Sequence, residues 1–451
     1  MTLVVCADVG STWTKVAVVD LDGATVVGTA TRPTTVGTDV LDGLDAAVHA
    51  AGGDGYPRYV CSSAGGGLRL AVVGYERLVT ARAGQQVGLS AGARVVHVAA
   101  GRLDGAGLAD LRAARPDVIL LVGGTDGGDA EVLEHNGRRL ATARPRVPVV
   151  VAGNADARDP VTAALVERGM PAVGTGNVLP RIGVLNPGPA RAAIREVFLR
   201  HVIGGKRLSR GTRFAELVRG ATPDVVLAGV ELLADRTGIE LVVLDIGGAT
   251  TDVYSVLTPD AERHSGARRA ASGTLWRSRT VEGDLGMRWS ATGVVEAAHA
   301  ERLLGPAPDG PPASGPGDAT DGGLGEAARR RAADPGYLPG DAADAEAEER
   351  IATLAATVAL RRHGRDRDLR EVTLLVGSGG VLRHADPARA ARILAAPLSD
   401  HAGGWPLPHA ATVVVDRDYV LAPAGLLAAE HPSVAVELLR SRLLTVPSDS
   451  Q

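Results

Sequence analysis

Two segments of the chain repeat one pattern, in which an apolar run ends near an aspartate, passes through a glycine-rich turn and enters a second apolar run. The first reads LVVCADVGSTWTKVAVVD from Leu3, and the second reads LVVLDIGGATTDVYSV from Leu241. Such runs predict buried strands, and the glycines let the connecting backbone pass close to a ligand. A turn with exposed N–H groups suits phosphate oxygens. Either segment alone is equally consistent with a plain β-hairpin, but two in one chain favour a nucleotide-phosphate clamp.

The residue types in these turns suggest specific roles. Asp8 and Asp245 lie at strand ends beside a turn, where a carboxylate can hold a hydrated Mg²⁺, although each could simply cap its own turn. Lys15 could face a β- or γ-phosphate or be a cation at the strand edge. The threonines of the turns could donate to phosphate or be ordinary β-branched strand residues. The candidates for phosphate contact are Gly10, Ser11, Thr12, Lys15, Gly247, Gly248, Thr250 and Thr251.

The composition narrows the class of protein. The 451 residues suffice for two or three domains, and with only 3% aromatic residues the cores must consist of Val, Leu, Ile and Ala, as in parallel or mixed sheets. The net charge of −4 and the absence of a dense basic run argue against nucleic acid as a partner. No signal-peptide pattern or membrane-length apolar run is present, so we expect a soluble cytoplasmic protein. Cys6 and Cys61 lie in apolar runs and are expected to be buried core thiols.

Apolar periodicity predicts five parts along the chain. Residues 1–64 read as three antiparallel strands, a helix and a strand, the opening order of a ribonuclease-H-like domain. Residues 65–180 alternate short apolar runs with helix-length segments, which predicts an additional or inserted parallel α/β segment. Residues 181–304 hold crossover helices and the start of a second ribonuclease-H-like domain. Residues 305–342 read as a flexible Gly/Pro-rich linker, and residues 343–451 complete the second domain.

The middle segment contains a loop of glycine and aspartate, Gly123–Asp129, after the apolar run Val118–Val122. Ligands of parallel sheets bind beyond the carboxyl ends of the strands, so this loop is predicted to be functional. The sequence does not indicate which ligand it binds. The alternative is a βα turn in which Asp129 caps the next helix.

A third glycine-rich turn, Gly377–Gly380, follows a late apolar run. Two phosphate hairpins and then such a turn resemble the actin-like ATPase superfamily, which includes sugar kinases, chaperone ATPases and actin. The resemblance implies an α/β fold with two ribonuclease-H-like domains around a nucleotide cleft that binds ATP and Mg²⁺. It implies that Asp8–Lys15 and Asp245–Asp252 are the phosphate loops. The residues that it places against adenosine are Gly377, Gly379 and Gly380.

Four stretches narrow this resemblance: SSAGGGLRLAVVG, DVILLVGGTDGGD, VLDIGGATTDVYS and RTVEGDLGMRWS. They resemble the glutamate mutase L (MutL) accessory proteins, from Leu3 to about Gly293 and again from Glu371 onward. The resemblance implies an ATP-binding and slowly ATP-hydrolysing factor that maintains or reactivates an adenosylcobalamin-dependent mutase of the glutamate mutase or aminomutase type. The cobalamin-binding pattern D-x-H-x-x-G is absent, so direct cobalamin ligation is not predicted.

Glu282 and Asp284 flank a glycine in the VEGDLG stretch. Carboxylates at this spacing could polarise a water or hold a metal through its waters, whereas the alternative is a solvated loop. With the family resemblance, Glu282 and Asp284 join Asp8 and Asp245 as candidate catalytic residues of a Mg-dependent ATPase. Two other functions stay open: a small-molecule kinase of the same fold, and a nucleotide-sensing scaffold without catalysis.

Overall fold

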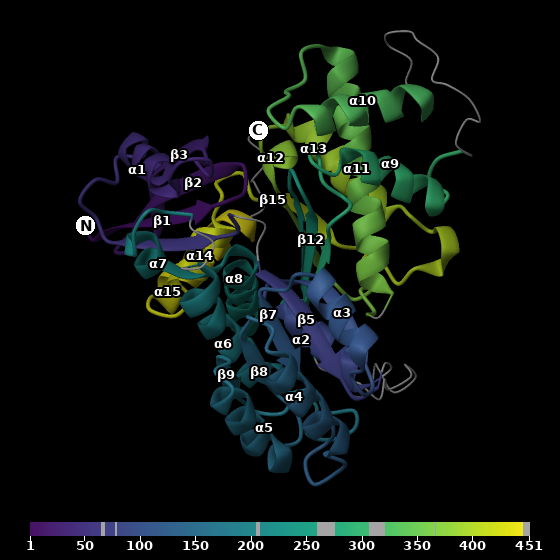
Figure 1. The fold of residues 1–451 in the computed structure, drawn as a ribbon. Coiled ribbons are helices and arrows are strands. Elements are labelled where there is room, and N and C mark those ends of the chain that lie inside the picture. The colour runs from purple at the N-terminus through teal and green to yellow at the C-terminus, as the bar shows by residue number, and fades with distance from the viewer. Residues whose placement is uncertain are drawn as a thin grey trace. The chain divides into compact units, whose positions relative to one another are not determined.

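The structure is a computed structural model in which the chain forms two compact units (Figure 1). Of the described residues, one unit comprises Met1–Val230, 276–278 and Ala422–Leu438, and the other Glu231–Thr258 and Arg279–Leu421 with the residues from Leu439 on. No helix in the described part of the chain is long and apolar enough to cross a membrane. The described residues are 1–64, 68–76, 79–203, 208–258, 276–305, 321–365 and 367–444.

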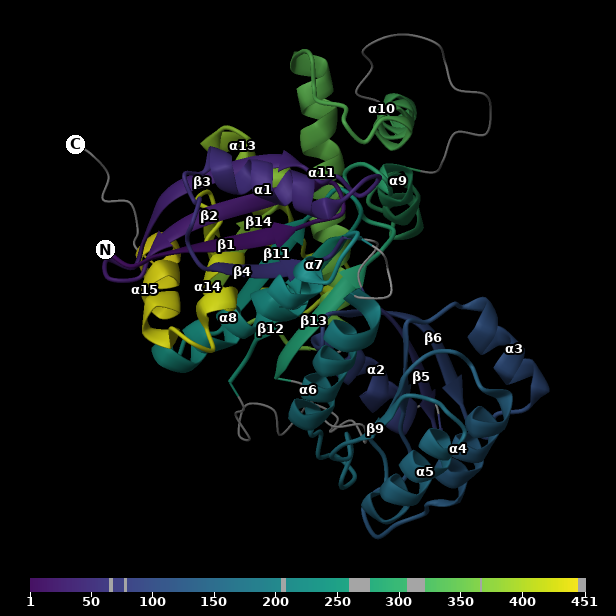
Figure 2. The same cartoon turned by 60° about the vertical axis from the view of Figure 1, so that its left-hand side comes forward.

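The first unit begins with a mixed five-stranded sheet of order β10-β4-β1-β2-β3. Strands β1, β2 and β3 are antiparallel neighbours, while β4 and β10 run parallel to β1. Helix α1 lies across β1–β3 (Figure 2), and its apolar residues join the core beneath them. This is the strand order of a ribonuclease-H-like domain. The elements are β1 (Leu3–Val9), β2 (Trp13–Asp20), β3 (Thr25–Pro33), α1 (Val40–Ala50), β4 (Arg58–Ser62) and β10 (Val218–Ala221).

The second unit repeats this order in a sheet β13-β12-β11-β14-β15. Here β11 and β12 are antiparallel, and β14 and β15 continue parallel to β11. The predicted pair of ribonuclease-H-like sheets is therefore confirmed. The strands are β11 (Leu241–Ile246), β12 (Thr251–Val256), β13 (Arg277–Glu282), β14 (Leu374–Ser378) and β15 (Thr412–Val415).

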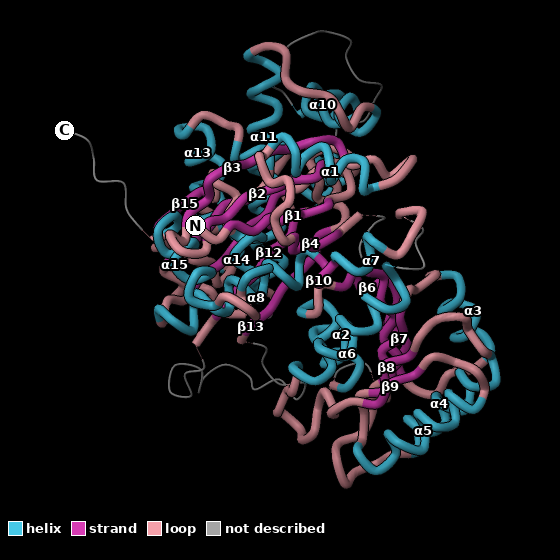
Figure 3. Tube along the Cα trace, turned by 90° about the vertical axis from the view of Figure 1, so that its left-hand side faces the viewer, coloured by secondary structure: helices cyan, strands magenta, loops and turns pink. Residues whose placement is uncertain are grey.

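The predicted parallel α/β segment forms a third sheet, which lies within the first unit and has the order β6-β5-β7-β8-β9. All its strands are parallel, and helices cover both faces (Figure 3). One face packs on α2 and α6 in a core that also contains residues of β1 and β2, and the other packs on α3, α4 and α5. The elements are β5 (Leu68–Gly74), α2 (Thr80–Ser90), β6 (Ala93–Ala100), α3 (Gly105–Ala113), β7 (Val118–Leu121), α4 (Glu131–Ala143), β8 (Val149–Val151), α5 (Ala155–Glu167), β9 (Ala172–Gly174) and α6 (Pro187–Val197).

Part of the predicted linker is a helix, which corrects the expectation for residues 305–342. Helix α10 spans Asp321–Ala333 and is anchored by the fully buried Arg331, whose Nε lies 2.5 Å from Oε2 of Glu348 on α11. Residues 306–320 lie outside the described residues, and the other domain boundaries stay predictions. The remaining elements are the π-helix η1 (Phe198–Ile203), α7 (Arg213–Leu217), α8 (Thr222–Thr237), α9 (Ala291–Ala300), α11 (Ala342–Gly364), α12 (Gly380–Arg383), α13 (Pro387–Leu398), the 3-10 helix η2 (Ala402–Gly404), α14 (Leu421–Leu427) and α15 (Pro432–Leu443).

Candidate functional site

The turns of the two predicted phosphate hairpins are built alike. In the first, the N–H of Gly10 donates to the carbonyl of Trp13 at 3.1 Å, and in the second the N–H of Gly247 donates to the carbonyl of Thr250 at 2.9 Å. A Cβ on either glycine would lie 2.8 Å from that carbonyl oxygen, which explains the glycine at both positions. The same local geometry therefore occurs at the same place in both ribonuclease-H-like sheets.

Each turn has backbone N–H groups that bond no described acceptor. Within the described residues, the N–H groups of Gly248 and Ala249 donate to no protein acceptor, and the same holds for Ser11 and Thr12. Ser11 is exposed and Thr12 half-buried. Successive N–H groups that are open in a turn form a concavity suited to an anion. Both turns thus keep the feature for which a phosphate site was predicted.

In the first hairpin, Asp8 and Lys15 are cross-strand neighbours. Asp8 is 4% exposed; its Oδ1 accepts a hydrogen bond from the Thr222 hydroxyl at 2.5 Å, and its Oδ2 lies 3.7 Å from Nζ of Lys15. The thiol of Cys61 also points at this carboxylate, with Sγ 3.8 Å from Oδ1. Burial, with the charge of Asp8 next, raises the pKa of Cys61 well above its ordinary value, so the thiol is a neutral donor. The predicted side chains Asp8 and Lys15 therefore lie together and form an ion pair.

The second hairpin has a different charge pattern at the equivalent positions. Asp245 faces Asp252 across the strands, and two like charges directly opposite are unfavourable. The buried Arg279 neutralises Asp252 by donating from Nε at 3.1 Å and from Nη2 at 2.6 Å to its Oδ1. The hydroxyl of Thr250 bonds the other oxygen at 3.2 Å. Within the described residues, Nη1 of Arg279 is buried without a hydrogen-bond partner.

The stretch VEGDLGMRWS is folded against the second turn. The N–H of Met287 donates to the carbonyl of Gly247 at 2.9 Å, and those of Arg288 and Trp289 donate to the carbonyl of Gly248 at 2.8 and 3.0 Å. These bonds occupy the carbonyl side of the turn. The loop after β13 thus holds the turn in place while the N–H groups stay open.

Two side chains and one glycine complete this contact. The hydroxyl of Ser290 donates to the carbonyl of Ala249 at 2.9 Å, and a Cβ on Gly286 would collide with the backbone of Ala249. The hydroxyl of Thr251 is fully buried and donates to the carbonyl of Leu285. Thr251, predicted as a phosphate contact, therefore has a structural bond that a phosphate role would have to break.

Glu282 and Asp284 converge on one guanidinium. Nη1 of Arg362 lies 2.9 Å from Oε2 of Glu282 and 2.8 Å from Oδ1 of Asp284, and its Nε lies 3.3 Å from Oε1 of Glu301. Burial raises the pKa of Glu282, while the hydrogen bond from Arg362 opposes that rise. The structure brings the two predicted carboxylates together, but as partners of an arginine.

The late glycine turn lies at the end of β14, where Ser378 is the parallel neighbour of Asp245. Gly379 has φ 102°, and a Cβ there would collide with the carbonyl of Ile246, so only glycine fits. Gly380 begins α12 and faces open space. Gly377 instead lies within β14, where a Cβ would lie 2.5 Å from a methyl of Leu394. Gly377 is therefore explained by packing.

Two acidic side chains of the Gly123–Asp129 loop accept hydrogen bonds from neighbouring segments of the protein. Oδ1 of Asp126 accepts from the N–H of Ala155 at 3.0 Å and from the Asn177 amide at 2.8 Å, and Oδ1 of Asp129 accepts from the N–H of Glu131 at 2.8 Å. The bond from Asp129 to the first residue of α4 agrees with the helix-capping alternative, and the functional role of the loop stays a prediction.

Comparison with known proteins identifies the family. The model of the family described as MutL protein matches residues 4–443. The curated Protein MutL of Clostridium tetanomorphum is 32% identical over 468 residues, which is 97% of this chain and 98% of the relative. The chain belongs to the MutL family.

Similarities to solved structures are much weaker. A diol dehydratase-reactivating factor in nucleotide-free form matches 96% of this chain and 100% of its own at 12% identity, with a TM-score of 0.36. A ROK family glucokinase from Streptomyces griseus, in complex with glucose and AMPPNP, matches 97% of this chain and 99% of its own at 13% identity, with a TM-score of 0.33. Assignment to the MutL family rests on the sequence matches.

Three residues of this chain contribute to the candidate site without having been predicted. Thr222 bonds Asp8 from 214 positions away, Arg279 neutralises a carboxylate of the second hairpin, and Arg362 binds both predicted carboxylates of the loop. Arg279 opens the RTVEGDLGMR stretch, so its inclusion in that motif was an available signal. Thr222 and Arg362 carry no comparable local pattern.

Proposed function

We propose that this chain binds ATP with Mg²⁺ through its two Asp-Gly hairpins and acts as an accessory or reactivating factor for an adenosylcobalamin-dependent mutase. The observation that carries the proposal is the repeated turn: equivalent glycines, Gly10 and Gly247, make equivalent hydrogen bonds in two sheets of one strand order. Each turn presents open N–H groups beside an aspartate, a combination that suits phosphate and its cation. Membership of the MutL family supports the role toward a mutase.

The donor set fits a magnesium ion that is bound largely through ATP and water. Within the described residues, no three His, Cys, Asp or Glu side chains gather into a metal site. Mg²⁺ commonly keeps several waters and takes one or two carboxylates together with substrate phosphates. Asp8 and Asp245 would hold it, Asp8 through water because Thr222 and Lys15 already engage its oxygens. When bound, the ion would neutralise phosphate charge.

ATP hydrolysis is expected to be slow and stimulated by the partner. Phosphoryl transfer depends mainly on positioning and charge neutralisation, and a group that orients the attacking water must reach it. Glu282 and Asp284 are both bound to Arg362 in this arrangement, so either could act on a water only with the oxygen lone pairs that this guanidinium leaves open. ATP consumption that instead rises sharply with one polyol or carboxylic acid would identify a small-molecule kinase.

Calorimetric titration with ATP and MgCl₂ tests the binding step. We expect Asp245→Asn to weaken Mg-dependent binding far more than Asp334→Asn, a change of an exposed aspartate whose carboxylate accepts from the N–H of Gly336 in its own turn. Asp8→Asn should weaken the same binding event, since the proposal requires both hairpins. Folded protein that gives no heat with millimolar nucleotide would overturn the proposal.

The partner role is tested with a glutamate mutase or aminomutase that has lost its adenosyl group. With this protein and Mg-ATP, the mutase should release its damaged cobalamin faster and regain activity. Asp8→Ala should abolish the effect. Release at the same rate with and without the protein, while ATP binding is intact, would refute the accessory role and leave a nucleotide-sensing scaffold.

A further inference from the structure

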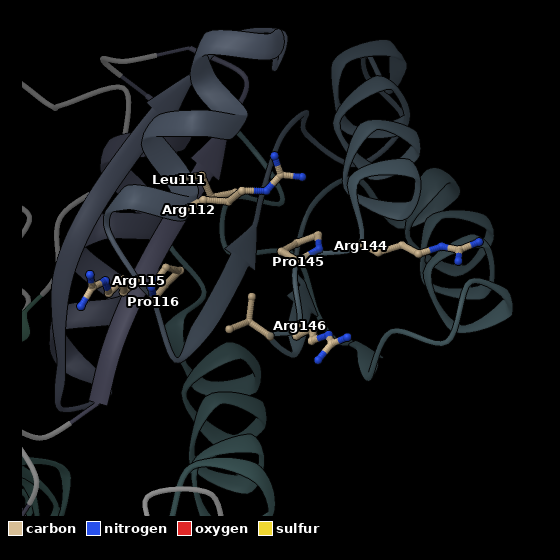
Figure 4. Close-up of a pocket in the computed structure, with 8 residues that line it drawn as sticks. Leu111, Arg112, Arg115, Pro116, Arg144, Pro145 and Arg146 are labelled. Atoms are coloured by element: carbon tan, nitrogen blue, oxygen red, sulfur yellow. The ribbon is translucent and has the colours of Figure 1, made fainter.

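The edge of the third sheet opposite the Gly123–Asp129 loop has a basic pocket of about 280 Å³ (Figure 4). It lies where the chain leaves α3 for β7 and leaves α4 for β8. Its polar lining is contributed by four exposed arginines: Arg112, Arg115, Arg144 and Arg146. We refer to these four side chains as the arginine cluster.

The pocket is formed by two turns of the same construction. Each turn contains the sequence Ala-Arg-Pro, and in each the arginine, Arg115 or Arg144, has a left-handed backbone with φ 45°. Glycine is the usual residue in that conformation at a helix end, and a longer side chain there is uncommon. The following prolines, Pro116 and Pro145, line the pocket between the arginines. The two turns therefore place an arginine at the same uncommon backbone position beside the pocket.

The arginine cluster is not neutralised by the protein. Within the described residues, none of its members forms an ion pair, and Arg112 donates only to the carbonyl of Ala143 at 3.1 Å. Three other arginines of the same segment do pair with acids: the exposed Arg102 and Arg138 and the half-buried Arg158. A concentration of unpaired positive charge on a chain of net charge −4 is complementary to an acidic ligand.

The directions of these side chains indicate the size of that ligand. In Figure 4 the guanidinium groups of Arg115 and Arg144 point to opposite sides, and that of Arg112 lies between them. Groups that diverge cannot close on one small anion, but they can flank an extended segment. The buried Leu111 and the two prolines give the pocket an apolar surface, and no aromatic ring lines it on which a nucleic-acid base could stack.

We propose that this pocket docks an acidic segment of a partner protein, with an apolar side chain in the pocket and flanking carboxylates on the arginine cluster. The inference rests on the proposed function only in expecting the segment to belong to the mutase. Docking needs no nucleotide, so it can be measured without ATP, and its failure is distinguishable from a failure of ATP binding.

Fluorescence anisotropy with a short peptide of glutamates around two leucines tests the proposal. The double reversal Arg115→Glu with Arg144→Glu should weaken binding at least about tenfold, and salt should weaken wild-type binding. Arg168→Glu is the matched control, because Arg168 is exposed in the next αβ turn but does not line the pocket. Arg146 does not have a positive φ, so Arg146→Glu is a second variant should the double reversal fold poorly.

Several results would overturn the proposal. They are equal loss with Arg168→Glu, no binding at millimolar peptide, and equal binding of a glutamine version of the peptide. Tighter binding of single-stranded DNA, lost in the double reversal, would assign the pocket to nucleic acid. Self-association of the chain that the double reversal abolishes would assign it to a second copy.

Discussion

Removal of the Arg279 guanidinium by Arg279→Met should strongly destabilise the second unit. The side chain of Arg279 is 4% exposed and that of its partner Asp252 is 12% exposed, so their ion pair is screened little by water. After the substitution, the Thr250 hydroxyl would be the remaining side-chain donor to Asp252 within the described residues, and Asp252 would face Asp245 across the strands.

Breaking a buried ion pair by removing one partner costs roughly 3–5 kcal/mol, because the remaining charge stays buried without compensation. The double variant Arg279→Met with Asp252→Asn should regain roughly 1–3 kcal/mol, since no unpaired charge is left and the amide oxygen can still accept from Thr250. Arg329→Met removes an exposed pair with Glu326 and should cost less than about 1 kcal/mol.

Urea unfolding of the full chain, followed by circular dichroism and by fluorescence, measures these differences. The reasoning is refuted if Arg279→Met costs no more than Arg329→Met. It is equally refuted if the double variant is no more stable than the single one, because the unpaired carboxylate would then not be the cause.

Three further outcomes are expected. Gly286→Ala should destabilise the chain by about 1–3 kcal/mol because its Cβ would collide with the hairpin turn, whereas Gly248→Ala, with 3.8 Å to the nearest atom, should be nearly neutral in thermal unfolding. Burial holds the pKa of His363 well below its usual 6.5, so below that pH the unfolded chain takes up a proton that the folded chain excludes. Stability should therefore fall by up to about 1.4 kcal/mol per pH unit on acidification, and His363→Gln should flatten the profile of melting temperature against pH. Burial also raises the pKa of Cys6 and Cys61, so a thiol reagent should label neither in folded protein and both in denaturant; rapid native labelling would contradict their placement.

The fold was predictable where short-range pattern decides it. Apolar runs, glycine turns and the spacing of the strands identified both ribonuclease-H-like sheets, since hairpin contacts lie close in sequence. The burial of Cys6 and Cys61 also followed from their place in apolar strands. The linker prediction was wrong for α10. The Gly/Pro-rich composition continues into the start of this helix, which the buried Arg331 holds on α11.

The site was predictable only in part, for the same reason. Thr251 begins β12 and its hydroxyl bonds the carbonyl of Leu285, whereas Thr250 lies in the turn and its hydroxyl bonds Asp252, so which of the two is buried depends on the loop that packs there. The pairing of Glu282 and Asp284 depends on Arg362, which is about 80 positions away and lies on another element. Contacts of that separation follow from tertiary packing and leave no local pattern.

The bonds at the two turns also place a natural optical probe at each hairpin. The chain has four tryptophans. The backbone carbonyl of Trp13 accepts the turn-closing bond of the first hairpin, and the backbone N–H of Trp289 donates to Gly248 of the second turn. The two residues are 44% and 59% exposed, so their emission is sensitive to what approaches from solvent. Replacing the other tryptophans by phenylalanine, and then one of this pair at a time, would give two spectrally simple proteins. Each would report on one turn without an attached dye, so the order in which the two turns respond to a titrant could be followed directly.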